Sequence, residues 1–188
     1  MTLLRQFRAA PNLLTLLRLF TIPFLVDAML DRHYRLAVAL FMLAGLTDAL
    51  DGRLARHLNQ STRLGQYLDP IADKLMLSTL FLTLTHIGLI PRYVTVLVFA
   101  RDLGILLIST LLFSTHTLRD FRPSVLGKLN TLLQITAVFC VMVSTVWLLP
   151  GLGMACHVLL VATAWLAPLS AAQYAFLVTQ RINTEPAT

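Results

Sequence analysis

The chain has 188 residues, of which 57% are hydrophobic and 13% are charged, whereas an average soluble domain carries about 25% charged residues. This composition argues against an ordinary soluble domain and indicates a lipid bilayer as the solvent. The net charge of +6 does not indicate nucleic-acid binding, because the 15 Lys and Arg residues are scattered at the ends of apolar runs. We therefore expect membrane lipids, and no nucleic acid, as partners.

Six apolar runs follow one another along the chain, separated by polar breaks or breaks with Pro and Gly. Each reaches or approaches the roughly 20 residues that an α-helix needs to cross a bilayer. The runs cover residues 12–30, 35–50, 70–89, 93–115, 125–149 and 153–179. They lack the alternation of apolar and polar residues that a membrane β-strand requires. The predicted fold is an all-α bundle of six transmembrane helices, and residues 1–188 are expected to form one domain.

The segment before the first run shows no small-residue cleavage site after a short apolar core, so we expect no removable signal peptide. Cytoplasmic loops are enriched in Lys and Arg, and this bias sets the orientation. With a cytoplasmic N-terminus, three arginines lie outside (Arg32, Arg35 and Arg92) and nine basic residues lie inside: Arg5, Arg8, Arg53, Arg56, Arg63, Arg119, Arg122, Lys128 and Arg181. We predict a bacterial inner-membrane protein in which residues 51–68 form a cytoplasmic junction.

Carboxylates gather at the cytoplasmic ends of the second and third runs. Four of the nine acidic residues fall within one 26-residue window: Asp48, Asp51, Asp69 and Asp73. The first two are three residues apart and the last two are four apart, so each pair lies on one face of its helix. Carboxylates gathered at a membrane edge repel one another and need compensating cations. Oxygen ligands suit Mg²⁺ or Mn²⁺, and two such ions form a common clamp for displacement at phosphorus.

Small residues and an arginine separate the two pairs of carboxylates. The order is D-x-x-D-G-x-x-A-R, eight residues, and then G-x-x-x-D-x-x-x-D, with Gly52, Ala55, Arg56 and Gly65 at the other fixed positions. The small residues leave room for a flat ligand, and an arginine forms a fork to phosphate oxygens. The alternatives are close helix packing for the small residues and solvated helix caps for the aspartates.

Further charged residues lie in or at the ends of the predicted spans. Arg18, Arg101 and Lys128 need partners, and Asp102 adjoins Arg101. An anionic acceptor would give Arg101 and Lys128 a reason to face a cavity, whereas lipid headgroups or an internal ion pair are the other interpretations. The two cysteines, at 140 and 156, are interpreted as packing residues without a disulfide or zinc. Asp27, inside the first run, has no assigned role.

The eight-position string resembles the full signature of the CDP-alcohol phosphotransferase family. The resemblance extends to a P-N-x-x-T-x-x-R start, to the later stretch GKLNTLLQ and to the six runs, so it covers most of the chain. It implies a homodimer of six-helix protomers, each with a polar cavity open to the cytoplasm and two metal ions. By this resemblance the metal ligands are Asp48, Asp51, Asp69 and Asp73, with Asp73 also the general base. The nucleotide-binding positions are Gly52, Ala55, Arg56 and Gly65.

The reaction implied by the resemblance moves a phosphatidyl group from CDP-diacylglycerol to a small alcohol and releases CMP, a step of phospholipid biosynthesis. Later stretches are similar to the branches of the family that form phosphatidylglycerophosphate or, with CMP release, cardiolipin. Glycerol 3-phosphate is therefore the first acceptor expected, phosphatidylglycerol the second and an inositol phosphate the third. Arg101 and Lys128 are the acceptor-binding candidates.

Two other classes of protein also place carboxylates in membrane helices. A divalent-cation transporter would hold its ligands near the midplane, often within inverted repeats. A membrane prenyltransferase also pairs aspartate-rich motifs with Mg²⁺, but has more spans. Acids clustered at one membrane edge beside an arginine favour the phosphatidyl transferase.

Overall fold

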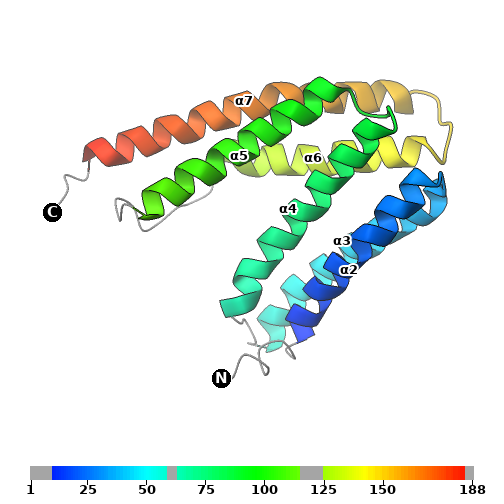
Figure 1. Ribbon diagram of the computed structural model, residues 1–188, viewed down its shortest axis with the longest axis horizontal. Coiled ribbons are helices and arrows are strands. Elements are labelled where there is room, and N and C mark those ends of the chain that lie inside the picture. Colours follow the sequence, from blue (N-terminus) through cyan, green and yellow to red (C-terminus); the bar gives the residue numbers. More distant parts are fainter. Residues whose placement is uncertain (1–9, 59–62, 115–124, 185–188) are drawn as a thin grey trace. The chain divides into compact units, whose positions relative to one another are not determined.

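The computed structural model describes residues 10–58, 63–114 and 125–184, and describes side chains over 13–48, 69–108, 110 and 125–180. These parts of the chain form six α-helices (Figure 1). They are α2 (Ala10–Leu30), α3 (Tyr34–Leu58), α4 (Arg63–His86), α5 (Arg92–Ser114), α6 (Val125–Ser144) and α7 (Leu152–Thr184). The all-α prediction is confirmed, and each apolar run corresponds to one helix.

The extent of the helices differs from the prediction near the acidic window. α3 continues to Leu58 and α4 begins at Arg63, so most of the expected junction over residues 51–68 is helical. The apolar runs mark only the parts of a helix suited to lipid, whereas Arg, Leu, Ala and Gln extend helices in water as well. The signature positions before residue 58 therefore lie on one continuous helix with the second apolar run.

Three helices are long and apolar enough to cross a membrane, judged by length and composition over the described residues. These segments are Leu13–Leu30 of α2, Val125–Ser144 of α6 and Leu152–Gln180 of α7. Large apolar side chains such as Phe20 and Phe24 are exposed on α2, as expected for a surface that faces lipid. These features support a membrane protein, and six spans stay a prediction.

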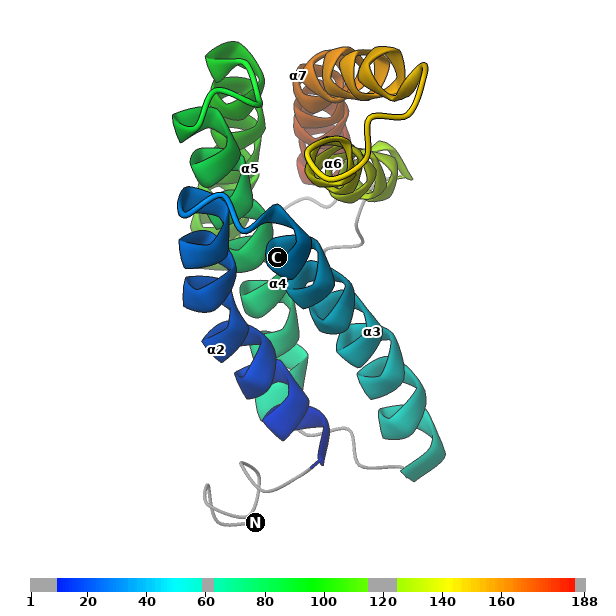
Figure 2. The same cartoon turned by 90° about the vertical axis from the view of Figure 1, so that its right-hand side faces the viewer.

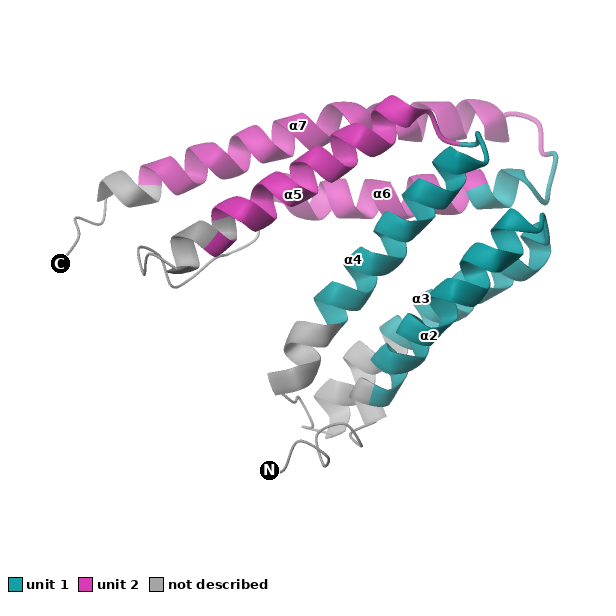
Figure 3. Ribbon diagram, viewed as in Figure 1, with its two compact units in different colours: residues 1–89, 142–148 teal, residues 90–141, 149–188 magenta. Residues whose placement is uncertain are grey.

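The chain divides into two compact units (Figure 3). One comprises residues 1–89 and 142–148, and the other residues 90–141 and 149–188. In the first unit α2 packs against both α3 and α4 (Figure 2). Small buried residues at these contacts let the helices approach closely: Ala28, Ala37, Ala44 and Ala72. The expectation of one domain over residues 1–188 stays a prediction.

In the second unit α5 packs along α7. Its core contains small and β-branched residues, among them Val94, Val98, Ala137, Ala164 and Ala167. Cys140 of α6 and Cys156 of α7 are buried there as free thiols, with their Sγ atoms 2.8 Å apart. The sequence did not predict this contact, because nothing in the spacing of the two cysteines indicates how α6 and α7 align.

Candidate functional site

One arginine of α2 joins the carboxylates of α3 and α4. Arg18 is buried, with 1% of its surface exposed. Its Nη2 atom lies 2.7 Å from Oδ1 of Asp48 on α3, and its Nη1 atom donates a hydrogen bond of 2.5 Å to Oδ1 of Asp73 on α4. The guanidinium group therefore bridges two of the predicted metal ligands, one from each pair of aspartates.

A second contact lies one turn away on the same two helices. The hydroxyl of Thr15 on α2 donates a hydrogen bond to Oδ1 of Asp69 on α4. Thr15 precedes Arg18 by three residues, and Asp69 precedes Asp73 by four, so each pair lies on one helix face. The two contacts follow the same order along both chains, so α2 and α4 run parallel here. Their polar faces meet, and this contact fixes the position of both α4 carboxylates.

The described carboxylates carry more negative charge than the arginine neutralises. The side chains of Asp48 and Asp73 are 49% and 45% exposed, so each keeps an accessible side away from Arg18. With Asp69, three carboxylates face one guanidinium group, and partly buried charges of one sign favour a bound cation. Carboxylate oxygens are ligands that suit Mg²⁺ or Mn²⁺, so the residue types fit these ions.

Among the side chains that the structure describes, no group of three His, Cys, Asp or Glu residues is arranged to hold a metal ion. Asp51, the fourth predicted ligand, lies one turn beyond Asp48 on α3, and its side chain is outside the described residues. The predicted metal set therefore stays a prediction that depends on Asp51.

The predicted nucleotide-binding positions lie on the same two helices as the carboxylates. Gly52, Ala55 and Arg56 belong to the last two turns of α3, and Gly65 belongs to the first turn of α4. Their side-chain positions are outside the described residues. Their assignment to the nucleotide stays a prediction, although the helices that carry them meet through Arg18.

The two candidate acceptor residues differ in their surroundings. Arg101 of α5 forms an ion pair of 2.8 Å with Oδ1 of Asp102, and its Nε atom donates a hydrogen bond of 2.9 Å to Oγ of Ser170 on α7. Both charged side chains are nearly buried, at 11% and 10% exposed. Lys128 of α6 is exposed, and no hydrogen bond or ion pair joins it to Arg101 in the described structure. The internal ion pair is present, and acceptor binding stays a prediction for both residues.

Comparison with known proteins decides the class. Residues 8–172 match the CDP-alcohol phosphatidyltransferase family. The chain belongs to this family. The matched range contains the full signature, the acidic ends of α3 and α4, and the Thr15 and Arg18 partners on α2. Membership confirms the resemblance read from the eight-position string and favours a phosphatidyltransferase over a cation transporter or a prenyltransferase.

Relatives of this CDP-alcohol phosphatidyltransferase chain fall into two named groups. It is 35% identical over 146 residues to a CMP-forming cardiolipin synthase of Rattus norvegicus, which covers 68% of this chain and 48% of the rat protein. It is 39% identical over 124 residues to the CDP-diacylglycerol–glycerol-3-phosphate 3-phosphatidyltransferase of Aquifex aeolicus, covering 65% of this chain and 68% of that protein. The similarly named Bacillus subtilis protein is 32% identical over 143 residues, covering 68% and 73%. The chain thus spans about half the length of the rat relative.

The contacts of Thr15 and Arg18 were not predicted from the sequence of this family member. The T-x-x-R spacing did indicate one polar face on α2, and a buried arginine required a partner, but neither feature identifies Asp69, Asp48 or Asp73. Asn130 and Gln134 of α6 were also missed. Both are buried, and no partner is described for the side-chain Nδ2 and Oδ1 of Asn130 or for Nε2 of Gln134 within the described residues. Their spacing of four places them on one face of the helix.

Proposed function

We propose that the chain catalyses transfer of a phosphatidyl group from CDP-diacylglycerol to a small alcohol, with release of CMP, in phospholipid biosynthesis. The observation that supports this most directly is the bridge from Arg18 to Asp48 and Asp73 in a chain with the family's signature. The bridge brings one carboxylate of each signature pair to a common group, as a shared reaction site requires.

In this proposal Asp73 is the general base. The hydroxyl oxygen of the acceptor forms a bond to the phosphorus that carries diacylglycerol, while the bond from this phosphorus to the CMP oxygen breaks on the opposite side. The Asp73 carboxylate takes the hydroxyl proton. Arg18 fixes Oδ1 of Asp73, and the 45% exposure of the side chain leaves it accessible to the acceptor.

The proposed cofactor is Mg²⁺ or Mn²⁺, with two ions per protomer held by Asp48, Asp51, Asp69 and Asp73. Such ions supply positive charge against the negative charge that grows on the phosphoryl oxygens. The support is the oxygen-only donor set and its excess of negative charge over Arg18. Thr15 and Arg18 hold the described ligands in position and leave their exposed sides free.

The proposed setting is the edge of a bacterial inner membrane, with six spans, a cytoplasmic N-terminus and a polar cavity open to the cytoplasm. The acyl chains of the lipid substrate then remain in the bilayer while the nucleotide reaches Gly52, Ala55, Arg56 and Gly65 from water. Apolar surface on α2 and the three apolar helices support a bilayer setting. A homodimer is part of the proposal and rests on the family resemblance.

Glycerol 3-phosphate is the first acceptor in this proposal. Its support is the similarity to the Aquifex aeolicus and Bacillus subtilis proteins, whose names state this acceptor and of whose lengths the chain covers 68% and 73%. The phosphate of the acceptor would bind to Arg101 and Lys128, which are placed on α5 and α6. Arg101 would then exchange or share its contact with Asp102.

Phosphatidylglycerol is the second acceptor candidate, because the rat relative named cardiolipin synthase is 35% identical over 146 residues. That protein is about twice as long as the part of it that is matched. An inositol phosphate is the third candidate and no relative named here favours it.

An acceptor panel tests the proposed function. Purified full-length protein would be incubated with CDP-diacylglycerol and Mg²⁺ or Mn²⁺, and with each acceptor separately. We expect release of CMP with glycerol 3-phosphate and a product whose mass is that of phosphatidylglycerophosphate. Asp27→Asn is the matched control, since Asp27 is an exposed carboxylate on α2 away from the signature, and it should retain activity. A wild-type chain that releases no CMP with any acceptor would contradict the proposal.

A further inference from the structure

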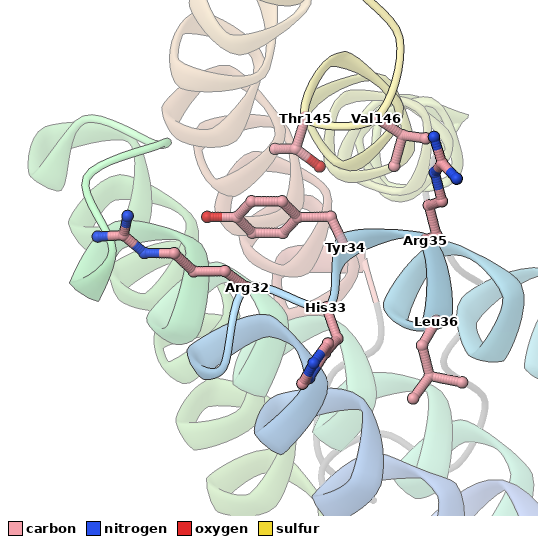
Figure 4. A pocket seen from close by; sticks show the side chains of 7 residues that line it. All are labelled: Arg32, His33, Tyr34, Arg35, Leu36, Thr145 and Val146. Atoms are coloured by element: carbon pink, nitrogen blue, oxygen red, sulfur yellow. The ribbon is translucent and has the colours of Figure 1, made fainter.

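A cavity of about 500 Å³ lies at the turn between α2 and α3, within the first unit (Figure 4). Its lining contains two arginines, a histidine and two hydroxyl groups, and consists of Arg32, His33, Tyr34, Arg35, Leu36, Thr145 and Val146. Asp48 follows Tyr34 by 14 residues on α3, which corresponds to about 21 Å along the helix. The cavity is therefore separate from the carboxylates.

The lining is positively charged. Arg32 and Arg35 are exposed, and neither has a carboxylate partner in the part of the chain that the structure describes. Figure 4 shows the Tyr34 ring between their side chains in this view, with Thr145 near the ring. Asp31 is exposed and precedes Arg32, but it does not line the cavity. Guanidinium groups combined with hydroxyl donors are suited to phosphate oxygens.

The backbone of Arg32 gives a second, independent indication. Its φ is 60°, in the left-handed region. The amide of His33 donates to the carbonyl of Ala28 at 2.8 Å, and the amide of Arg32 donates to the carbonyl of Met29 at 3.2 Å. These two bonds form a Schellman motif at the end of α2, in which glycine is the favoured residue at the left-handed position.

The end of α4 shows the usual solution. There Gly88 has a φ of 80°, the amide of Leu89 donates to the carbonyl of Leu84 at 2.8 Å, and the amide of Gly88 donates to that of Thr85 at 3.1 Å. Arg32 therefore holds a position that glycine occupies in the same motif one helix pair later. A residue that tolerates an unfavourable backbone conformation points to a use for its side chain.

We propose that this cavity binds the phosphate of an anionic phospholipid headgroup. Leu30, two residues before Arg32, ends the apolar segment of α2 that is long enough to cross a membrane, so the cavity lies at headgroup depth. Tyr34 is a residue type enriched at this depth, and exposed Leu36 adds apolar contact beside it. Arg32 and Arg35 are also two of only three arginines in the predicted outer links, where basic residues are scarce. The proposal does not depend on the proposed reaction.

The test measures lipid binding to the purified full-length protein. Native mass spectrometry in detergent would count bound phosphatidic acid against zwitterionic phosphatidylcholine, neither of which is an acceptor in the proposed reaction. We expect phosphatidic acid to bind more tightly. Arg32→Gly and Arg35→Gln should each weaken it about fivefold, and the double variant about 25-fold, as expected for one interfacial arginine each. Arg92→Gln, at an exposed arginine outside the cavity, should leave binding unchanged.

The Arg32→Gly variant separates binding from folding, because glycine suits a φ of 60° better than arginine does. Its thermal stability should therefore equal or exceed that of the wild type while its phosphatidic acid binding falls. Equal lipid binding by the wild type and the double variant would overturn the proposal. Inorganic phosphate is the remaining arm: arginine-dependent binding of phosphate alone, without arginine-dependent binding of phosphatidic acid, would overturn the lipid assignment.

Discussion

Asp73→Asn is expected to lower the rate of CMP release by at least about a hundredfold, because it removes a general base whose contribution is typically about 10²–10⁴-fold. Asparagine has nearly the same shape, and its Oδ1 atom still accepts the hydrogen bond that Arg18 donates at 2.5 Å in the wild type. The fold and the contact between α2 and α4 should therefore persist. The measurement compares turnover with the binding of CDP-diacylglycerol by the same preparation.

Nucleotide binding should change much less than turnover in this variant, since the nucleotide positions lie on other residues of α3 and α4. Asp27→Asn is the matched control, as it makes the same chemical change on α2 at an exposed position. If Asp73→Asn kept turnover within a few-fold of the wild type, Asp73 would not be the base and the site assignment would be wrong.

Arg18→Ala is expected to have the largest effect on stability. Arg18 is 1% exposed and contacts both Asp48 and Asp73. Removal of one partner of a buried ion pair typically costs about 3–5 kcal/mol. The half-exposed carboxylates can regain water, so we expect a loss near 3 kcal/mol, toward the lower end of that range. The measurement is the free energy of unfolding in mixed micelles, or the apparent melting temperature where unfolding is irreversible.

Divalent cations provide the internal check on this variant. Without the guanidinium group, the carboxylates have an even larger excess of negative charge, so Mg²⁺ should stabilise Arg18→Ala more than it stabilises the wild type. Arg18→Lys should lie between the two, since lysine keeps the charge but loses the fork that reaches two carboxylates. An Arg18→Ala variant as stable as the wild type, with no added response to Mg²⁺, would show that the bridge does not hold α3 and α4 together.

The number and type of the helices could be predicted because a bilayer requires long apolar runs, and each run became one helix. Their ends in the acidic window could not, since helices continue in water beyond the part that suits lipid, as α3 does to Leu58. Six spans were expected, but the segments that satisfy the criteria for length and composition lie on α2, α6 and α7 within the described residues. Charged residues such as Asp48 and Arg101 make α3 and α5 less apolar.

The site followed from the sequence only as far as residue types and spacing along each helix. The spacing of Asp69 and Asp73 predicted one polar face, and α4 presents both residues to α2. The identity of the opposing residues depends on which helices pack together, and a single sequence does not specify that. The partner of Arg101 was also open, and the pair with Asp102 is the internal alternative that the sequence allowed.

Electron paramagnetic resonance of Mn²⁺ bound to the purified full-length protein, in the presence of CDP-diacylglycerol, tests the proposed metal site most directly. The account predicts two spin-coupled Mn²⁺ ions per protomer, since ions clamped in one phosphoryl-transfer site lie about 3.5–4 Å apart. It also predicts that Asp51→Asn loses the coupled signal. A wild-type protein that binds no Mn²⁺, or binds only isolated ions with the same spectrum as Asp51→Asn, would contradict a cation site shared by α3 and α4.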